Sequence, residues 1–340
     1  MKQPGFFDIE ERYYALSKCG DPLEKLNECI PWDKFRPIIE KALEKERKTT
    51  AGRKPFDPIV MFKTLVLQTM YNLSDYQTEY QLRDRFTFIR FLGLGIHDTI
   101  PDEKTIWLFR ENLTNAGVIK KLFDKFNRYL EENGYEARKG QIIDASIVEV
   151  PIQRNSREDN KKLSEGEIPE EWEENPNKMS QKDTEADWTK RKDDSHFGYK
   201  NHINVDVAGK FIRGYEVTSA SIHDSQVIDD IIDKRNTDTR LYADSAYSSE
   251  EIEKKLCIRG LESRINHKGY RNHPLSNTKI NINRRQSKIR ARIEHVFGFQ
   301  HNSMAGGFIR TIGVIRASTK IGLMNIVYNF RRYSYLCGIC

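Results

Sequence analysis

The sequence predicts a mixed α/β protein, because a long stretch of helical periodicity is followed by short β-branched segments that alternate with helical ones. The first 135 or so residues carry apolar side chains at helical spacing, and short apolar runs begin after residue 140. A chain of 340 residues suggests about two domains. Hydrophobic residues make up 38% and aromatic residues 11%, which suffices for a core and excludes wholesale disorder.

Three helical segments are predicted in the N-terminal region. Asp57 before Pro58 is typical of an N-cap followed by proline in the first turn, and Asp102 is the candidate N-cap of the second segment. The third segment stops at Asn133-Gly134. The apolar positions at helical spacing, which indicate packing, are Ile59, Phe62, Val66 and Met70, then Ile106, Phe109 and Leu113, then Val118, Leu122, Phe126 and Leu130.

Strands and helices alternate in the rest of the chain. The short apolar, β-branched pattern of a strand occurs at 141–148, 202–207, 211–218, 239–244 and 261–265. Gly209 is typical of a hairpin turn between the second and third of these strands. Helical patterns occur at 224–234, from Ser249 onward, and at 284–300.

Residues 153–195 are predicted to form a polar insertion or flexible loop. The segment carries 13 acidic and 9 basic residues, and its large aliphatic residues or methionines are few. Such a composition buries too little apolar surface to offset the entropy of ordering. The aliphatic residues and methionine in question are Leu163, Ile168 and Met179.

Charge is distributed unevenly along the chain, whose net charge is +6. Residues 271–340 carry 12 basic residues and one acidic residue, Glu294. A strongly basic region indicates a polyanionic partner, most often nucleic acid, although a solvated face balanced elsewhere is the alternative. Basic clusters at 45–48 and 53–54 are further candidate DNA contacts, with the same alternative. A soluble metabolic hydrolase would leave the basic C-terminal region unexplained.

Several other classes of protein are disfavoured. No uncharged apolar run reaches the roughly 18 residues that span a bilayer, and the N-terminus has acidic residues where a signal peptide is apolar. Five scattered cysteines do not make a disulfide framework, and Cys337 and Cys340 are interpreted as part of a frayed tail. Glycine-rich nucleotide-binding loops are absent from the sequence. We therefore expect a cytosolic protein without a nucleotide cofactor.

Three carboxylates are the strongest candidates for chemistry. Asp144 lies within an apolar strand, Asp244 ends a second strand, and Glu294 lies on a basic helix. A carboxylate in an apolar strand is costly unless it is paired or binds a metal. Each one alone is compatible with a structural, hydrogen-bonded role. Together, two strand aspartates and a helix glutamate provide the oxygen ligands that a two-metal phosphoryl-transfer site requires.

Five segments of the chain resemble, in order and spacing, the motifs of DDE transposases of the "insertion sequence five" family, within the insertion sequence four/five-like superfamily. They are residues 143–145, 196–202, 221–225, 242–247 and 290–298. N-terminal positions that match the same family are residues 52–55, 101–102, 105 and 109–110. The resemblance covers nearly the whole chain.

The resemblance implies a fold and a domain organisation. It implies an RNase H-like domain at 136–330, with a mixed five-stranded sheet flanked by helices and a polar insertion at about 153–195. A helical N-terminal domain at 1–135 would bind DNA ends and dimerise, and residues 331–340 would form a C-terminal tail.

The resemblance also implies the activity of a DNA transposase. Such an enzyme cuts the terminal inverted repeats of a mobile element by metal-dependent hydrolysis and joins the 3′-OH to target DNA. Asp144, Asp244 and Glu294 are then the catalytic residues and the metal ligands, with two Mg²⁺ or Mn²⁺ ions per site. The expected partners are double-stranded DNA and a second copy of the chain, without a membrane, in a prokaryotic cytoplasm and nucleoid. A DNA-binding derivative without catalysis and an RNase H-like nuclease without strand transfer are the alternatives.

A set of cationic and aromatic residues is predicted to contact DNA. Arg290 shares a helix face with Glu294, and Lys200 and His202 point the same way on a strand, to contact DNA or orient a catalytic carboxylate. Trp188 lies beside cations, so it stacks on an unpaired base or caps a small local core. The predicted DNA-binding residues are Lys200, His202, Lys288, Arg290, Arg292, His301, Arg310 and Trp188.

The chain departs from the superfamily's Y-x2-R-x3-E-x6-K signature at two positions. Ser287 stands in the tyrosine position and His301 in the lysine position. The substitute for the missing lysine is left open among Lys288, Arg310 and His301 itself. His223 is interpreted as a structural turn residue before the helix at 224–234.

Overall fold

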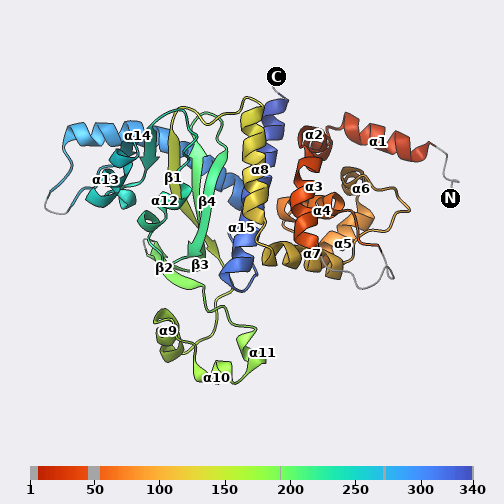
Figure 1. The fold of residues 1–340 in the computed structure, drawn as a ribbon, viewed down its shortest axis with the longest axis horizontal. Coiled ribbons are helices and arrows are strands. Elements are labelled where there is room, and N and C mark those ends of the chain that lie inside the picture. Colours follow the sequence, from red (N-terminus) through yellow and green to blue (C-terminus); the bar gives the residue numbers. More distant parts are fainter. Residues whose placement is uncertain (1–6, 45–53, 192, 271–272, 339–340) are drawn as a thin grey trace. The chain divides into compact units, whose positions relative to one another are not determined.

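A computed structural model describes residues 7–44, 54–191, 193–270 and 273–338 (Figure 1). The basic cluster at 45–48, residues 52–53 of an N-terminal motif and Cys340 lie outside the described residues. The chain divides into unit 1, residues Met1–Phe126 with Ile326–Cys340, and unit 2, residues Asn127–Asn325. The boundary predicted at residue 135 lies inside unit 2. Within the described part, a search for helices with the length and hydropathy of a membrane span found none.

Unit 1 is helical, and the N-caps expected from the sequence are present. The Asp57 carboxylate accepts a hydrogen bond from Ile59 N at 2.8 Å, and that of Asp102 accepts one from Thr105 N at 2.7 Å. The predicted segments are α4, α7 and α8. The helices are α1 (Asp8–Lys18), α2 (Pro22–Cys29), η1 (Trp32–Phe35), α3 (Arg36–Leu43), α4 (Pro58–Met70), α5 (Asp75–Asp84), α6 (Phe86–Leu92), α7 (Glu103–Asn115) and α8 (Ile119–Glu132), the last of which continues into unit 2.

Aromatic rings from distant parts of the chain form the centre of unit 1. Phe330, from the C-terminal part of α15 (Val314–Cys337), is fully buried, and its ring lies 4.6 Å from that of Phe126 and 5.7 Å from that of Phe35. The tail predicted from residue 331 is therefore wrong as far as Cys337, because these residues continue a packed helix. Tyr333 is also buried.

The sheet of unit 2 is mixed, as predicted for this fold class. Strand order is β2-β3-β1-β5-β6, with β4 also paired to β3. Strands β2, β4 and β1 run antiparallel to β3, whereas β5 and β6 run parallel to β1. Five of the six strands are those predicted, and β2 comes from the insertion. The strands are β1 (Gln141–Glu149), β2 (Asp187–Arg191), β3 (Asp194–Asp206), β4 (Ile212–Ser219), β5 (Arg240–Ala243) and β6 (Glu262–Ile265).

Helices cover both faces of this sheet, and successive residues of β1 face opposite sides. Ile143 belongs to an apolar cluster with residues of α12 (Ile228–Ile231) and α13 (Glu250–Ile258). Its neighbour Asp144 points to the other face, where α14 (Asn277–Gly298) packs against β1 and β5. Figure 1 shows α12 and α13 beside the sheet.

Two helices differ in length from the sequence prediction. The helix expected at 224–234 is a 3-10 turn, η2 (Asp224–Gln226), followed by the single turn of α12. At its end, Asn204 Nδ2 of β3 donates to the Ile231 carbonyl at 2.9 Å, so a carbonyl left without a helical partner is satisfied. Helix α14 begins earlier than expected, since Ser276 serves as its N-cap, and it continues into a π-helical turn, η4 (Phe299–Ser303).

The polar insertion is ordered rather than a loop, so that part of the prediction is wrong. Trp172 is 1% exposed, and Lys182 Nζ lies 4.8 Å from the centre of its ring. One tryptophan supplies the small core that a count of aliphatic residues overlooks. The helices of the insertion, which Figure 1 shows beyond the end of the sheet, are α9 (Arg157–Ser164), α10 (Glu170–Glu173) and α11 (Pro176–Met179).

Phe330→Ala tests the contribution of α15 to unit 1. Removing a fully buried phenyl ring from an aromatic cluster is expected to lower the free energy of unfolding by about 3–5 kcal/mol. Urea unfolding followed by circular dichroism measures the change. Tyr335→Ala, at an exposed position of the same helix, is the control and should change it by less than about 0.5 kcal/mol. Equal effects of the two substitutions would contradict this packing.

Candidate active site

Two of the three candidate carboxylates meet at one edge of the sheet. Strands β1 and β5 are parallel neighbours in the register Ile142 opposite Tyr242. Continued by two residues, that register brings Asp144 level with Asp244, which directly follows β5. The backbone sets the Asp244 side chain, because its Oδ1 accepts a hydrogen bond from Ser245 N at 2.6 Å. The sheet register thus places two carboxylates from distant parts of the chain together.

One guanidinium contacts both carboxylates. Arg290 Nη2 lies 3.1 Å from Asp144 Oδ2, and Arg290 Nη1 lies 3.4 Å from Asp244 Oδ1. Arg290 comes from α14, so three elements converge at this point. Charge-assisted hydrogen bonds of this kind are stronger than neutral ones, and partial burial reduces their screening by solvent.

Glu294 follows Arg290 by one turn of α14 and is exposed. Burial raises the pKa of Asp144; Arg290 opposes this shift, and the negative charge of Glu294 adds to it. Glu294 therefore lies near enough to act on Asp144 electrostatically. The three predicted catalytic residues share one neighbourhood, with Arg290 as the cation between two of them.

The carboxylates are not gathered into a metal-binding cluster. Among the described residues, no group of three or more His, Cys, Asp and Glu side chains is close enough to hold a metal ion. The donor set nevertheless suits Mg²⁺, which prefers carboxylate oxygens and keeps several waters. The Arg290 guanidinium is a positive charge between Asp144 and Asp244, as a bound cation would be. The types of side chain present therefore suit a divalent metal ion.

His301 lies on the same face of β1 as Asp144. Its Nε2 is 2.7 Å from the hydroxyl oxygen of Ser146, two residues beyond Asp144 on the strand. Burial, with a smaller contribution from Arg191, lowers the pKa of His301, so the imidazole is neutral at pH 7. The residue in the lysine position of the signature therefore supplies a hydrogen-bonding ring near the carboxylates rather than a fixed positive charge. No pattern in the sequence pointed to Ser146 as the partner of His301.

Lys200 and His202, predicted to contact DNA or to orient a catalytic carboxylate, both bind groups within unit 2. His202 is fully buried, and its Nε2 lies 2.9 Å from the Thr218 hydroxyl. Lys200 Nζ donates to the Ile222 carbonyl at 2.8 Å and pairs with Asp224 Oδ1 at 2.9 Å. The alternation along the strand was predicted correctly, but both side chains point to the inner face with α12 rather than toward solvent.

Of the other predicted DNA-binding residues, some are exposed and some contact other parts of the protein. Lys288 and Arg310 are exposed, and the Arg310 guanidinium lies 5.8 Å from the ring centre of Phe308. Arg292 is half-buried, and its guanidinium donates to the Val207 carbonyl. Trp188 is 41% exposed, with its ring 5.2 Å from that of Phe197. The packing of Trp188 fits a local cap, and its exposed part leaves room for a base.

Two polar residues near the site were not singled out in the sequence. Asp224 belongs to the 221–225 segment, and its partner is Lys200. Tyr247 is 1% exposed, and its hydroxyl has no hydrogen-bond partner among the described residues. His223 has the structural role predicted for it, since it caps η2 through Ser225.

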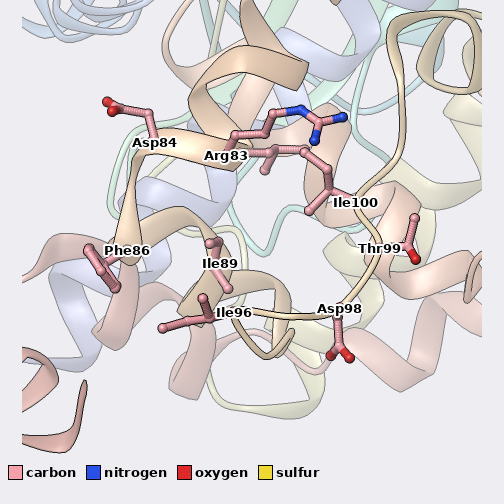
Figure 2. Close-up of a pocket in the computed structure, with 9 residues that line it drawn as sticks. Arg83, Asp84, Phe86, Ile89, Ile96, Asp98, Thr99 and Ile100 are labelled. Atoms are coloured by element: carbon pink, nitrogen blue, oxygen red, sulfur yellow. The ribbon is translucent and has the colours of Figure 1, made fainter. Parts of the chain in front are cut away.

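Two pockets of unit 1 are lined by residues other than the candidate site residues. One, of about 310 Å³, is lined by residues of α5, α6 and the loop that follows (Figure 2). Figure 2 shows Ile89 and Ile96 close together and Asp98 and Thr99 on the adjoining loop. Another, of about 850 Å³, lies among α3, α4 and α7. Neither is lined by a predicted site residue, so the carboxylate edge of the sheet remains the candidate active site.

Two known protein families match the chain. The family model described as "Transposase DDE domain" matches residues 135–330, and the one described as "Transposase domain (DUF772)" matches residues 11–112. The search of solved structures gave no match. The first model spans more than half of the chain and contains β1, β5 and α14, which carry the site.

The burial of His202 predicts a pH dependence of stability. Burial lowers its pKa from 6.5 to about 4, so below pH 6.5 the unfolded chain binds a proton that the folded chain does not. Stability therefore falls as the pH falls from 6.5 toward 4, by about 2 kcal/mol at pH 5 from this residue. Urea unfolding of the wild type and His202→Gln at pH 7 and pH 5 measures the difference. Identical pH dependence in both would contradict a buried neutral imidazole.

Proposed function

Because the chain belongs to the DDE transposase family, we propose that it is a transposase of the insertion sequence five group that cuts element ends and joins them to target DNA. The family supports a transposase with an RNase H-like catalytic domain, implies a DNA substrate, and generally uses a divalent metal such as Mg²⁺. The observation that carries the site is the contact of Arg290 with both Asp144 and Asp244.

In this proposal Asp144, Asp244 and Glu294 hold two Mg²⁺ or Mn²⁺ ions. Two such ions activate the attacking oxygen and stabilise the leaving oxygen of a phosphodiester. Arg290 already contacts the same carboxylate oxygens, so it competes with the metal for them. An Arg290 side chain displaced from the two aspartates keeps its charge, because a guanidinium does not lose its proton in proteins, and its fork matches a phosphate.

The chain's other residues bind and orient the DNA. Lys288 and Arg310 offer exposed positive charges to the phosphate backbone, and Phe308 beside Arg310 adds an exposed ring. His301, neutral and hydrogen-bonded to Ser146, takes the lysine position as a hydrogen-bond donor to a phosphate oxygen. Water, and later the exposed 3′-OH, is the nucleophile, so neither a covalent enzyme intermediate nor a nucleotide cofactor is needed.

The partners in the proposal follow from the reaction. Unit 1 and the basic face of α14 bind the terminal inverted repeats, and target DNA enters the same site. Two ends must be held at once, so a homodimer assembles on DNA. Because its substrate is DNA, the protein acts in the cytoplasm at the nucleoid.

A cutting and joining assay tests the proposal. Purified protein is mixed with Mg²⁺ or Mn²⁺ and labelled DNA that carries the inverted repeats flanking the gene. A metal-dependent nick at the repeat boundary, and joining of a pre-cut end to a plasmid, are expected. Cutting without joining would indicate a nuclease of the same fold, and binding without cutting would indicate a DNA-binding derivative; either result contradicts the proposal.

Removing any one of the three carboxylates should abolish cutting. Asp144→Ala, Asp244→Ala and Glu294→Ala each remove a proposed metal ligand while leaving the exposed cations in place. Cutting in the same assay is expected to fall at least about 1,000-fold, since each ligand contributes several kcal/mol to the transition state. Affinity for the repeat DNA, measured by fluorescence anisotropy, should stay within a few fold. A variant that cuts at near wild-type rates would show that its residue is not part of the site.

Lys288→Ala tests the phosphate contacts of α14. Loss of one phosphate contact should weaken binding to all DNA sequences alike and reduce the salt slope of log K by about 1. Anisotropy titrations at several salt concentrations measure both quantities. Lys234→Ala is the matched control, because Lys234 is exposed but follows α12 on the opposite face of the sheet. The same slope for wild type and Lys288→Ala would remove Lys288 from the DNA-binding surface.

A further inference from the structure

A polar cluster lies on the face of the sheet opposite Arg290. Residues of β1 and β3 that stand opposite each other point to the same face, and His202 stands opposite Ala145, not Asp144. Lys200 and His202 are therefore on the face covered by α12, with Thr218 of β4 and Asp224. None of these residues has a role in the chemistry proposed above.

Lys200 is the centre of this cluster. Its ammonium donates to the Ile222 carbonyl at 2.8 Å and pairs with Asp224 Oδ1 at 2.9 Å, and the side chain is 13% exposed. Ile222 lies just before η2, and Asp224 is the first residue of η2. One strand residue thus fixes the backbone before η2 and the first side chain within it.

The η2 turn supports the segment that follows Asp244. It packs against η3 (Ser245–Tyr247), which begins directly after Asp244. The Asp244 carboxylate caps η3 through Ser245 N, so its orientation depends on where η3 lies. Tyr247 anchors η3 in the apolar cluster that contains Val227, the residue after η2.

The Tyr247 side chain, within η3, is buried near η2. Its hydroxyl is without a hydrogen-bond partner among the described residues. Burial raises its pKa, and the charges of Asp224, Asp144 and Asp244 add to the shift. The η2 turn, which Lys200 holds, is thus connected to the candidate active site through η3.

We propose that Lys200 is a positioning residue for Asp244. Its ion pair with Asp224 holds η2 against η3, and η3 sets the Asp244 carboxylate for metal binding. This inference rests on the proposed function, which makes Asp244 a metal ligand. Of the two roles predicted for Lys200, a DNA contact or the orientation of a catalytic carboxylate, it assigns the second.

The test compares Lys200→Met, Lys200→Arg and Asp224→Asn with the wild-type chain. Mn²⁺ affinity is measured by electron paramagnetic resonance titration without DNA, and DNA affinity by anisotropy. Lys200→Met and Asp224→Asn should weaken Mn²⁺ binding about 10-fold, as loss of outer residues around a metal does, and lower kcat with unchanged DNA affinity. Lys200→Arg, which keeps the charge, should recover most of the Mn²⁺ affinity.

Lys182→Met is the matched control. Lys182 also donates to a backbone carbonyl and a side-chain oxygen, those of Arg154 and Asn155, but it lies in the insertion. Its substitution should leave Mn²⁺ affinity unchanged. Circular dichroism and urea unfolding verify that each variant is folded, and Asp224→Asn keeps the residue volume if Lys200→Met does not fold.

Unchanged Mn²⁺ affinity in folded Lys200→Met or Asp224→Asn would overturn the inference and leave the proposed function standing. Weakened DNA binding with unchanged Mn²⁺ affinity would overturn it in favour of a DNA contact. A wild-type chain that binds no Mn²⁺ would instead remove the proposed function and this inference together, a result visible before any variant is made.

Discussion

The contact of Arg290 with Asp144 and Asp244 is the interaction on which the arrangement of the catalytic unit depends. Two carboxylates on neighbouring strands repel each other, and partial burial strengthens that repulsion unless a cation lies nearby. Arg290 supplies the cation from α14, so the helix must cross β1 and β5 at that height. The Arg290 contacts therefore depend on both the parallel register of the two strands and the position of the helix.

The two faces of the sheet divide the remaining polar residues by role. The face with α14 carries Asp144 and the Ser146–His301 pair. The face with α12 carries Lys200 and His202, which bind Asp224 and Thr218. A strand alternates its side chains, so one strand can serve chemistry on one side and support on the other. The η2 and η3 turns link the two faces at the edge where Asp244 lies.

The candidate site residues that the sequence singled out are those where local chemistry conflicts with local structure. Asp144 interrupts an apolar strand, and Glu294 is the single acid of a basic region, so both stood out. The face on which Lys200 and His202 lie could not be predicted, because spacing shows that two residues share a face but not which element covers that face. The order in the insertion depends on Trp172, and the helical end of α15 on rings such as Phe330 that pack against distant residues. Tertiary contacts of this kind leave no periodic signal.

Manganese-soaked crystals of the protein would test most directly whether Arg290 and a metal share the same carboxylates. The account predicts an anomalous peak coordinated by Asp144 and Asp244, with the Arg290 guanidinium moved away from at least one of them. A peak coordinated by other residues, or none at a concentration that supports DNA cutting, would contradict the account.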